Sequence, residues 1–386
     1  MPGEIQGFID GLRPEIRTLP LYNAGLSTEY VKATYNVEHV AKLGSNENSF
    51  PPSPKVLTAI ESALSAVGLY PDPSCRELRT ALAQRLDVSP ERLMFGNGSD
   101  DVIAVAVQTF LSPGDEVVTI SPSYGLHVIF PLSFGATVRA VPIGPDNTAD
   151  VEALTAAIGP RTRMVMFSNP SNPVGTSIGE EDLQRLLAAI PENALLIFDE
   201  AYFEYAAADN AYPSFLGMLE RWRRPWLVLR TFSKAYGIAG LRVGYAIASD
   251  AALVDLMDRV RGPFNVNRLA QAAALAALQD AEYARDCVVR TTRERERVRR
   301  ALGELGYRPV PSLTNFLFFD VHTDSAELAK SLLPHGVIVK AWRDPGFSNH
   351  IRVSIGSREA NDQFLAAMQE SAMLRAAMPG TEARSK

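Results

Sequence analysis

Lys234 lies in a segment whose residue types suit a cofactor that carries an aldehyde and a phosphate. Residues 231–245 hold Ser233, Lys234, three glycines and Arg242 between two apolar runs that are typical of buried strands. A lysine amine forms a Schiff base with an aldehyde when its pKa is low enough to leave free amine. Ser233 and Arg242 together could hold a phosphate. The segment predicts binding of pyridoxal phosphate (PLP); the alternative is a surface lysine in a glycine-rich loop.

Residues 96–101 give a second phosphate signal. Gly98, Ser99 and Asp100 follow an apolar run and begin a helical pattern. Backbone amides at such a helix start bind phosphate, helped by the helix dipole. A dinucleotide-binding fingerprint is disfavoured because Asp101 stands where a third glycine or alanine is required. The plainer alternative is that Ser99 or Asp100 only caps the helix.

Three more positions follow apolar runs. Asp199 ends the run 195–198, where a carboxylate is costly unless it meets a cation such as a protonated pyridine nitrogen. Tyr124 could stack on a flat ring, and Asn172 could donate a hydrogen bond to a phenolic oxygen. Ordinary packing and turn chemistry are the alternatives for Tyr124 and Asn172. A metal at Asp199 is disfavoured because no histidine lies near it in sequence or at ligand spacing.

These positions need a scaffold that gathers the ends of strands. Seven short apolar runs alternate with helical patterns, which predicts an α/β fold with a mostly parallel, doubly wound sheet covered by helices. Such sheets bind ligands at the carboxyl ends of their strands, where the motifs above fall. The runs are residues 93–95, 117–120, 138–141, 164–167, 195–198, 227–229 and 243–247, and helical patterns include 99–111, 123–134, 150–158 and 180–190.

After residue 249 the pattern becomes helical, with a long helix expected over 281–305 and a last helix from 358 to about 373. Apolar runs at 316–319, 337–339 and 351–355 alternate with helices there, which predicts a smaller α+β domain. Arg352 in the last run could grip a carboxylate with its planar fork, unless it is a surface arginine on an edge strand.

The length of 386 residues is enough for two domains. We predict an N-terminal arm with one short helix (1–45), a large PLP-binding domain (46–260) and a small C-terminal domain (261–386), with which the N-terminal segment could pack. The net charge of −6 gives no reason to expect nucleic-acid binding. Two cysteines make no disulfide framework, and no secretory signal or membrane span is expected, so the expected location is cytoplasmic.

Several short motifs together resemble the histidinol-phosphate aminotransferase family, which belongs to the fold-type I, class I/II PLP-dependent aminotransferases. The resemblance covers about residues 8 to 372 and implies an aspartate aminotransferase-like fold with a seven-stranded sheet, PLP as cofactor, and reversible transamination. The motifs are KLGSNEN (42–48), YPDP (70–73), GSD (98–100), DEAY (199–202), RGPFNVN (261–267), TNF (314–316) and IRV (351–353).

The resemblance also implies a role for each site residue. Lys234 binds the aldehyde and moves the substrate proton, and Asp199 pairs with the ring nitrogen. Tyr70 reaches the phosphate of a neighbouring subunit, which implies a homodimer. Arg352 holds the carboxylate of glutamate and the phosphate of histidinol phosphate in turn. Tyr202 and Asn172 hydrogen-bond the ring's 3-oxygen, and Tyr124 stacks on the ring. The cofactor phosphate is bound by Gly98, Ser99, Asp100, Ser233 and Arg242. The substrate is contacted by Asn46, Tyr22 and Lys340.

Two departures from the family pattern concern the amino donor. Residues 48–54 read NSFPPSP where many members have NPxGPSP, and Lys340 replaces a usual arginine. Trp342 and Phe50 could favour an aromatic side chain. The resemblance implies histidinol phosphate as the donor and 2-oxoglutarate as the acceptor. Because of these departures, an aromatic amino acid (Phe or Tyr) is the alternative donor. A decarboxylase on the same scaffold and a PLP-binding regulatory module without turnover are further alternatives.

Overall fold

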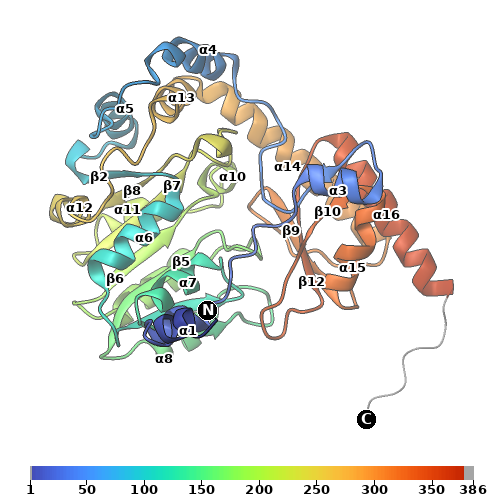
Figure 1. Cartoon of the computed structure of the whole chain (residues 1–386), viewed down its shortest axis with the longest axis horizontal. Coiled ribbons are helices and arrows are strands. Elements are labelled where there is room, and N and C mark those ends of the chain that lie inside the picture. The colour runs from blue at the N-terminus through green and yellow to red at the C-terminus, as the bar shows by residue number, and fades with distance from the viewer. Residues whose placement is uncertain (1, 378–386) are drawn as a thin grey trace.

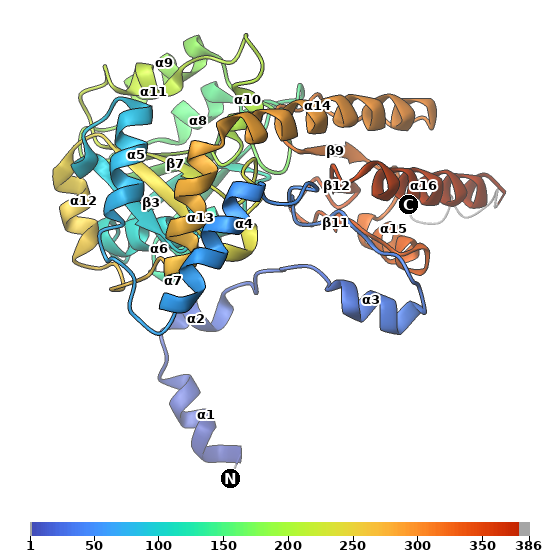
Figure 2. The ribbon, with the colours of Figure 1, turned by 90° about the horizontal axis from the view of Figure 1, so that it is seen from above.

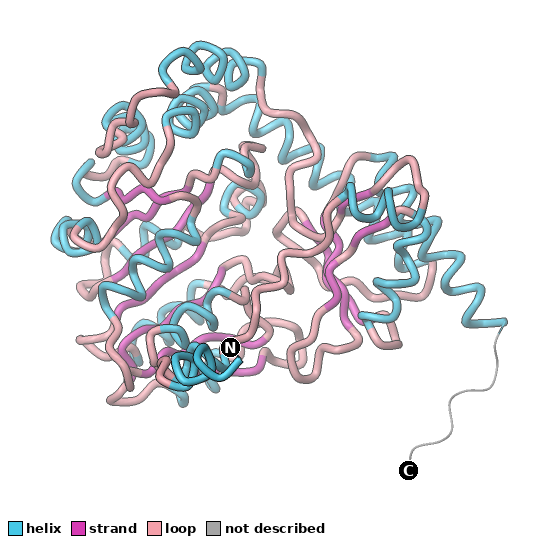
Figure 3. Tube along the Cα trace, in the orientation of Figure 1, coloured by secondary structure: helices cyan, strands magenta, loops and turns pink. Residues whose placement is uncertain are grey.

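The structure, a computed structural model, describes residues 2–377. The ends of the predicted arm and of the predicted C-terminal domain, residue 1 and residues 378–386, lie outside the described residues. A seven-stranded sheet forms the centre of the larger part (Figure 3). β8 runs antiparallel to both of its neighbours, and all other adjacent strands are parallel, which confirms the predicted mostly parallel sheet. The strands in spatial order are β2 (Leu93–Gly96), β8 (Gly244–Ala248), β7 (Trp226–Thr231), β6 (Leu195–Asp199), β5 (Thr162–Ser168), β3 (Glu116–Ser121) and β4 (Thr137–Pro142).

The apolar runs form central strands because both faces of the sheet are covered. In β6, Leu196 and Phe198 face one apolar cluster, whereas Leu195 and Ile197 face another. Successive side chains of a strand point to opposite faces, so a continuous apolar run fills two cores at once. The edge strand β4 is largely exposed.

Helices cover both faces of this sheet (Figure 1). One face carries α6 (Ser99–Phe110), α7 (Leu126–Ser133) and α12 (Ala251–Asp258). The other face carries α4 (Pro54–Ala63), α5 (Arg76–Leu86), α8 (Val151–Ala157), α9 (Glu180–Ala189), α11 (Phe215–Leu219) and α13 (Arg268–Gln279). α13 lies beyond the predicted boundary at residue 260, yet it packs with α4 and α5.

The C-terminal part is a smaller α+β unit with its own apolar core, as predicted. Its antiparallel sheet has the order β11 (Lys340–Ala341), β12 (His350–Ser354) and β9 (Phe316–Asp320). The helices α14 (Ala281–Glu304) and α15 (Ser325–Leu332) pack on it, and α16 (Arg358–Ala377) packs on both helices and on β1 and β10. The predicted strand 337–339 is shorter: β10 (Val337–Ile338) pairs in parallel with β1 (Ala41–Lys42), and Lys340 belongs to the other sheet.

The N-terminal segment holds three helices rather than the one expected: α1 (Pro2–Asp10), α2 (Pro14–Thr18) and α3 (Thr28–Tyr35). Local capping explains α3, because the Ser27 hydroxyl accepts from the Tyr30 amide and Asn36 ends the helix in the left-handed conformation. α1 projects away from the rest of the molecule, whereas α3 lies beside the smaller unit (Figure 2). Among residues 2–377 no helix is both long and apolar enough to span a membrane. A short helix, α10 (Phe203–Ala206), follows β6 in the larger part.

Candidate active site

A cavity of ≈ 800 Å³ lies where β5, β6 and β7 end, with β11 and β12 of the smaller unit on its other side. The carboxyl ends of parallel strands meet at this edge of the sheet. Two of the predicted site residues, Gly98 and Tyr70, do not line the cavity. Those that do are Tyr22, Asn46, Ser99, Asp100, Tyr124, Asn172, Asp199, Tyr202, Ser233, Lys234, Arg242, Lys340 and Arg352.

Lys234 follows the end of β7 and directs its amine toward the N-terminal segment. Its Nζ lies 3.2 Å from the carbonyl oxygen of Asn46 and 3.4 Å from that of Ser45. Burial, followed by the charge of Arg352, lowers the pKa of Lys234 to about 8. An appreciable fraction of its amine is therefore unprotonated near neutral pH.

Asp199 is buried at the end of β6 and accepts two hydrogen bonds. Its Oδ1 accepts from the Ala201 amide at 3.0 Å, and its Oδ2 lies 3.1 Å from Nε2 of His127. His127 lies on α7 and is completely buried, and its Nδ1 is 3.4 Å from the Ser123 hydroxyl. His127 is not predicted from the sequence, because α7 brings it to Asp199 from 72 residues away and no local motif marks it.

The start of α6 forms a polar end of the cavity. Arg242 donates to the Asp100 carboxylate at 3.2 Å and faces the Ser233 hydroxyl at 3.4 Å. The Asp100 carboxylate also accepts from the Tyr124 hydroxyl at 2.8 Å. A Cβ at Gly98 would collide with the Arg242 guanidinium, and the backbone at Gly98 has φ +87°. Glycine is thus required for this close approach, and the helix amides, a hydroxyl and an arginine converge on one place.

Tyr202 lies at the centre of a buried polar group. Its hydroxyl accepts from the side-chain amide of Asn46 at 2.8 Å and from that of Asn172 at 3.3 Å. Burial raises the pKa of Tyr202 to about 12, so the hydroxyl stays protonated. Asn172 also accepts from Arg352 at 2.6 Å, and this contact links the polar group to β12.

The smaller unit contributes two cations that face each other across a strand pair. Lys340 of β11 is the direct partner of Arg352 in β12, and directly opposed side chains lie on the same face of a sheet. Burial and then Arg352 lower the pKa of Lys340 to about 8. Arg352 donates to Gly44 O at 2.8 Å, while its Nε has no partner within residues 2–377. Two opposed cations, one with a spare N–H, suit an anionic ligand.

Tyr70 lies outside the cavity of its own chain. Its side chain is 78% exposed and stacks on Phe264 with 4.6 Å between ring centroids. The predicted role across a subunit interface is therefore still a prediction. Within the described part of the chain, no cluster of three or more histidine, cysteine or acidic residues could hold a metal ion.

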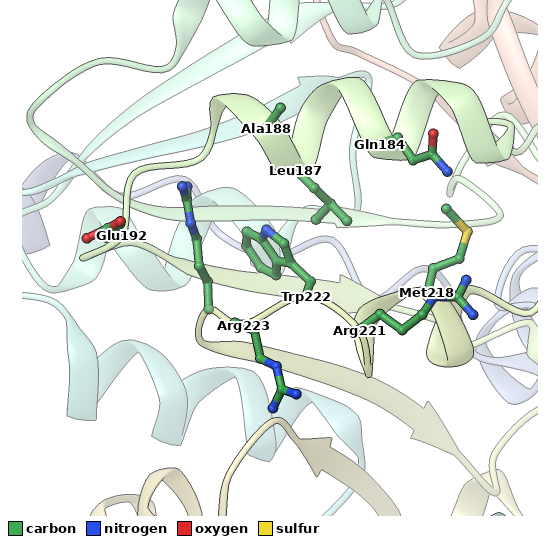
Figure 4. A pocket seen from close by; sticks show the side chains of 9 residues that line it. Gln184, Leu187, Ala188, Glu192, Met218, Arg221, Trp222 and Arg223 are labelled. Carbon is green, nitrogen blue, oxygen red and sulfur yellow. The ribbon is translucent and has the colours of Figure 1, made fainter.

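A second hollow of ≈ 840 Å³ lies between α9 and the segment that precedes β7 (Figure 4). Leu187, Met218 and Trp222 form its apolar wall, and Glu192 and three arginines stand around it. It lies near the amino ends of β6 and β7, away from the edge at which such sheets bind ligands. None of the predicted site residues lines it.

Comparisons with known proteins show the family to which the chain belongs. The profile of the family "Aminotransferase class I and II" matches residues 38–368. The chain is 47% identical to histidinol-phosphate aminotransferase 3 of Rhizobium meliloti (strain 1021), over 93% of this chain and 97% of that one. It is 44% identical to histidinol-phosphate aminotransferase 1 of Mesorhizobium japonicum, over 94% and 98% of the two chains.

Solved structures show the same fold. Histidinol-phosphate aminotransferase from Sinorhizobium meliloti, solved in complex with pyridoxal-5'-phosphate, superposes with a TM-score of 0.86 and 30% identity, covering 95% of this chain and 98% of that one. A double mutant of Thermus thermophilus aspartate aminotransferase superposes with a TM-score of 0.76 and 26% identity, over 92% and 99%. These findings confirm the predicted aspartate aminotransferase-like fold. The chain therefore belongs to the class I and II aminotransferases and, within them, to the histidinol-phosphate aminotransferase family.

Proposed function

We propose that this aminotransferase uses PLP to move the amino group of L-histidinol phosphate to 2-oxoglutarate, giving imidazole-acetol phosphate and glutamate in histidine biosynthesis. One observation carries the proposal. A single cavity contains a lysine amine of lowered pKa, the buried carboxylate of Asp199, and the opposed cations Lys340 and Arg352. The 47% identity to a histidinol-phosphate aminotransferase over nearly the whole chain supports the choice of donor.

The residues around the cavity fit PLP. The cofactor phosphate would lie against the first amides of α6, at Ser99 and Asp100, with Ser233 and Arg242 beside it. Asp199 would face the ring nitrogen, and the hydrogen bonds from Ala201 and His127 fix the orientation of its carboxylate. When bound, PLP supplies an aldehyde that accepts the amino group and a ring that takes up an electron pair.

The neutral amine of Lys234 would bind the cofactor aldehyde and carry the substrate's Cα proton. With a pKa of about 8, about one amine in ten is free at pH 7, far more than for an exposed lysine. Tyr202, held by Asn46 and Asn172, can donate a hydrogen bond to an oxygen of the ring because burial maintains its proton.

Arg352 and Lys340 would bind the anionic group of each substrate in turn. The Nε of Arg352 has no hydrogen-bond partner among the described residues, and Lys340 lies directly opposite Arg352 in the strand pair. A carboxylate or a phosphate in this position removes the repulsion between the two cations. Tyr22 and Asn46 would border the substrate on the N-terminal side.

The proposed functional unit is a cytoplasmic homodimer in which Tyr70 serves the partner's cofactor phosphate. Leu64, Val67 and Leu69, which precede Tyr70 in the sequence, are exposed as well, and exposed large apolar side chains suit an interface between subunits. The proposed large and small domains would meet at the cavity. Cys75 and Cys287 are both buried and unpaired, which suits a reducing compartment.

Transamination of aromatic amino acids is the second candidate. Trp342 lines the cavity and could contact an aromatic side chain, whereas Phe50 does not line it and packs under Arg290 at 4.1 Å. The deciding experiment compares kcat/KM for histidinol phosphate, phenylalanine and tyrosine with 2-oxoglutarate as acceptor. We expect histidinol phosphate to be preferred at least about tenfold, and a preference for either aromatic amino acid would overturn the proposed donor.

A further inference from the structure

We propose that Arg343 completes a three-cation subsite with Lys340 and Arg352, which binds the dianionic phosphate of the donor and favours it over monoanionic amino acids. The inference rests on the proposed function and assigns a substrate-binding role to a residue outside the family motifs described above. Its basis is the position, charge and lack of partners of Arg343.

Arg343 lines the same cavity as the two opposed cations. It lies just after β11, where the hydrogen bond from Trp342 N to His350 O at 3.0 Å extends the strand pairing by one residue. The charge of Arg343 contributes, after burial and Arg352, to the lowered pKa of Lys340. The guanidinium is thus within electrostatic reach of the Lys340 ammonium.

The charge of Arg343 is not neutralised by the protein. Its guanidinium makes no hydrogen bond or ion pair with the residues whose side chains the structure describes, 5–373, and its side chain is exposed at the cavity. Asp344 is the acid that accompanies it in this segment; burial raises the pKa of Asp344, and its carboxyl has no ion pair to the described cations. The other acids of the cavity are Glu47, Asp100 and Asp199. They already contact Lys42, Arg242 and His127, respectively.

Lys340 and Arg352 already donate hydrogen bonds to protein groups, whereas Arg343 donates none to the described residues. Lys340 donates to the carbonyl oxygen of Asn23, and Arg352 donates to Asn172 and Gly44. The Arg352 guanidinium also lies over the rings of Phe316 and Trp342, with its Cζ 5.3 and 5.8 Å from the two ring centroids. A phosphate dianion carries twice the charge of a carboxylate and more acceptor oxygens. A third, uncommitted guanidinium therefore benefits the phosphate more than the carboxylate.

The test compares Arg343→Gln and Arg343→Lys with wild-type holoenzyme. Arg293→Gln is the matched control, because Arg293 is an exposed arginine of α14 without a hydrogen bond or ion pair to the described residues. We expect Arg343→Gln to raise KM for histidinol phosphate about tenfold at nearly constant kcat, and to flatten the dependence of kcat/KM on ionic strength. KM for phenylalanine should stay within about twofold, and Arg343→Lys should retain most of the affinity.

Inorganic phosphate gives a readout that does not depend on the donor. At saturating PLP, its inhibition constant against glutamate should rise about tenfold in Arg343→Gln and not in Arg293→Gln. If wild type does not use histidinol phosphate, the proposed donor fails, and this inhibition constant alone decides the role of Arg343. Equal inhibition constants for wild type and Arg343→Gln would overturn the inference, even if histidinol phosphate is the donor.

Discussion

The reactivity of Lys234 depends on its surroundings. Burial and Arg352 lower its pKa to about 8 from an ordinary value of 10.5, although Asp100 and Glu47 act in the opposite direction. Only an unprotonated amine attacks an aldehyde. We therefore expect the rate at which the PLP-free protein captures PLP to rise with pH to a plateau just above pH 8, measured by the visible absorbance that develops on mixing.

The matched control for this pH profile is Lys234→Ala, which should develop no such band. Borohydride reduction followed by peptide mapping should find the cofactor on Lys234 alone. A capture rate that still rises steeply at pH 10, or cofactor fixed on one of the other six lysines, would remove Lys234 from the proposed role.

His127 acts on the site through Asp199. Replacing His127 with Phe removes the N–H that lies 3.1 Å from Oδ2 and leaves a buried carboxylate with one donor fewer. The loss of a hydrogen bond to a charged group corresponds to ~1.5–3 kcal/mol, so we expect kcat to fall at least about tenfold while KM changes little. The absorbance spectrum of the bound cofactor should shift as well, because the acid beside its ring nitrogen is less well held.

The control for His127 is Ser123→Ala, since Ser123 touches the other ring nitrogen at 3.4 Å. This change should affect kcat less than His127→Phe does. Wild-type kcat and an unchanged spectrum in His127→Phe would show that the hydrogen bond from His127 contributes nothing to the reaction.

Among the residues that line the cavity, those that directly follow an apolar run are predicted best from the sequence. Asp199 and Lys234 each follow an apolar run that ends at the cavity, so their placement follows from the parallel sheet. His127 could not be predicted in this way, because its contact depends on how α7 packs against the sheet. Tyr70 is the opposite case: a recognisable motif predicts its role, but its own chain leaves it exposed and outside the cavity.

At the scale of elements, the close approach of α6 to β8 shapes the proposed phosphate site. A Cβ at Gly244 of β8 would collide with the backbone of Gly98 and Ser99, where α6 begins. Gly244→Ala should push the helix start away from the strand. We expect a PLP dissociation constant at least about tenfold higher and a loss of ~1–3 kcal/mol in unfolding free energy, measured by cofactor titration and denaturant unfolding.

Gly262→Ala is the control for this change, because an added Cβ at Gly262 meets no atom within 4 Å. Its PLP affinity and unfolding free energy should match wild type within error. If Gly244→Ala binds PLP as tightly as wild type, the contact between strand and helix does not govern the phosphate site.

The pairing of β11 with β12 shows where prediction from sequence stops at this scale. The apolar pattern predicts a strand at 337–339 and another at 351–355, but it does not give their partners. In the structure, residues 337–338 pair with β1, and Lys340 changes to the other sheet and lies opposite Arg352. This change of partner creates the opposed cations, and it results from the packing of the N-terminal segment on the smaller unit.

At the scale of the whole molecule, the cavity lies between two apolar cores. The large sheet supplies Asp199 and Lys234, and the smaller unit supplies Lys340 and Arg352. The sequence predicts both units from their strand and helix patterns. It does not predict from patterns alone that residues 20–24 also line the cavity, because irregular backbone has no periodic signal.

The proposed active site needs residues from two subunits. Dimers that combine two different variant subunits test this proposal. If Tyr70 serves the partner's site, Tyr70→Ala weakens both sites of a homodimer, whereas Lys234→Ala abolishes both. A mixed dimer then has one intact site, in which the Lys234 of one subunit meets the Tyr70 of the other. Coexpression in equal amounts should thus restore activity to about a quarter of wild type, since half of the dimers are mixed and each has one working site.

If Tyr70 acted only within its own chain, the mixture would show no more than the residual activity of the Tyr70→Ala sites. In that case one subunit of every mixed dimer would lack the tyrosine and the other the lysine. Tyr70 is 78% exposed and stacks on Phe264, and Arg268 donates to its backbone carbonyl oxygen at 2.7 Å. These contacts hold the side chain on the surface, away from the cavity of its own chain. Recovery above the activity of Tyr70→Ala alone therefore requires the interface, and a mixture no more active than Tyr70→Ala would contradict the shared site.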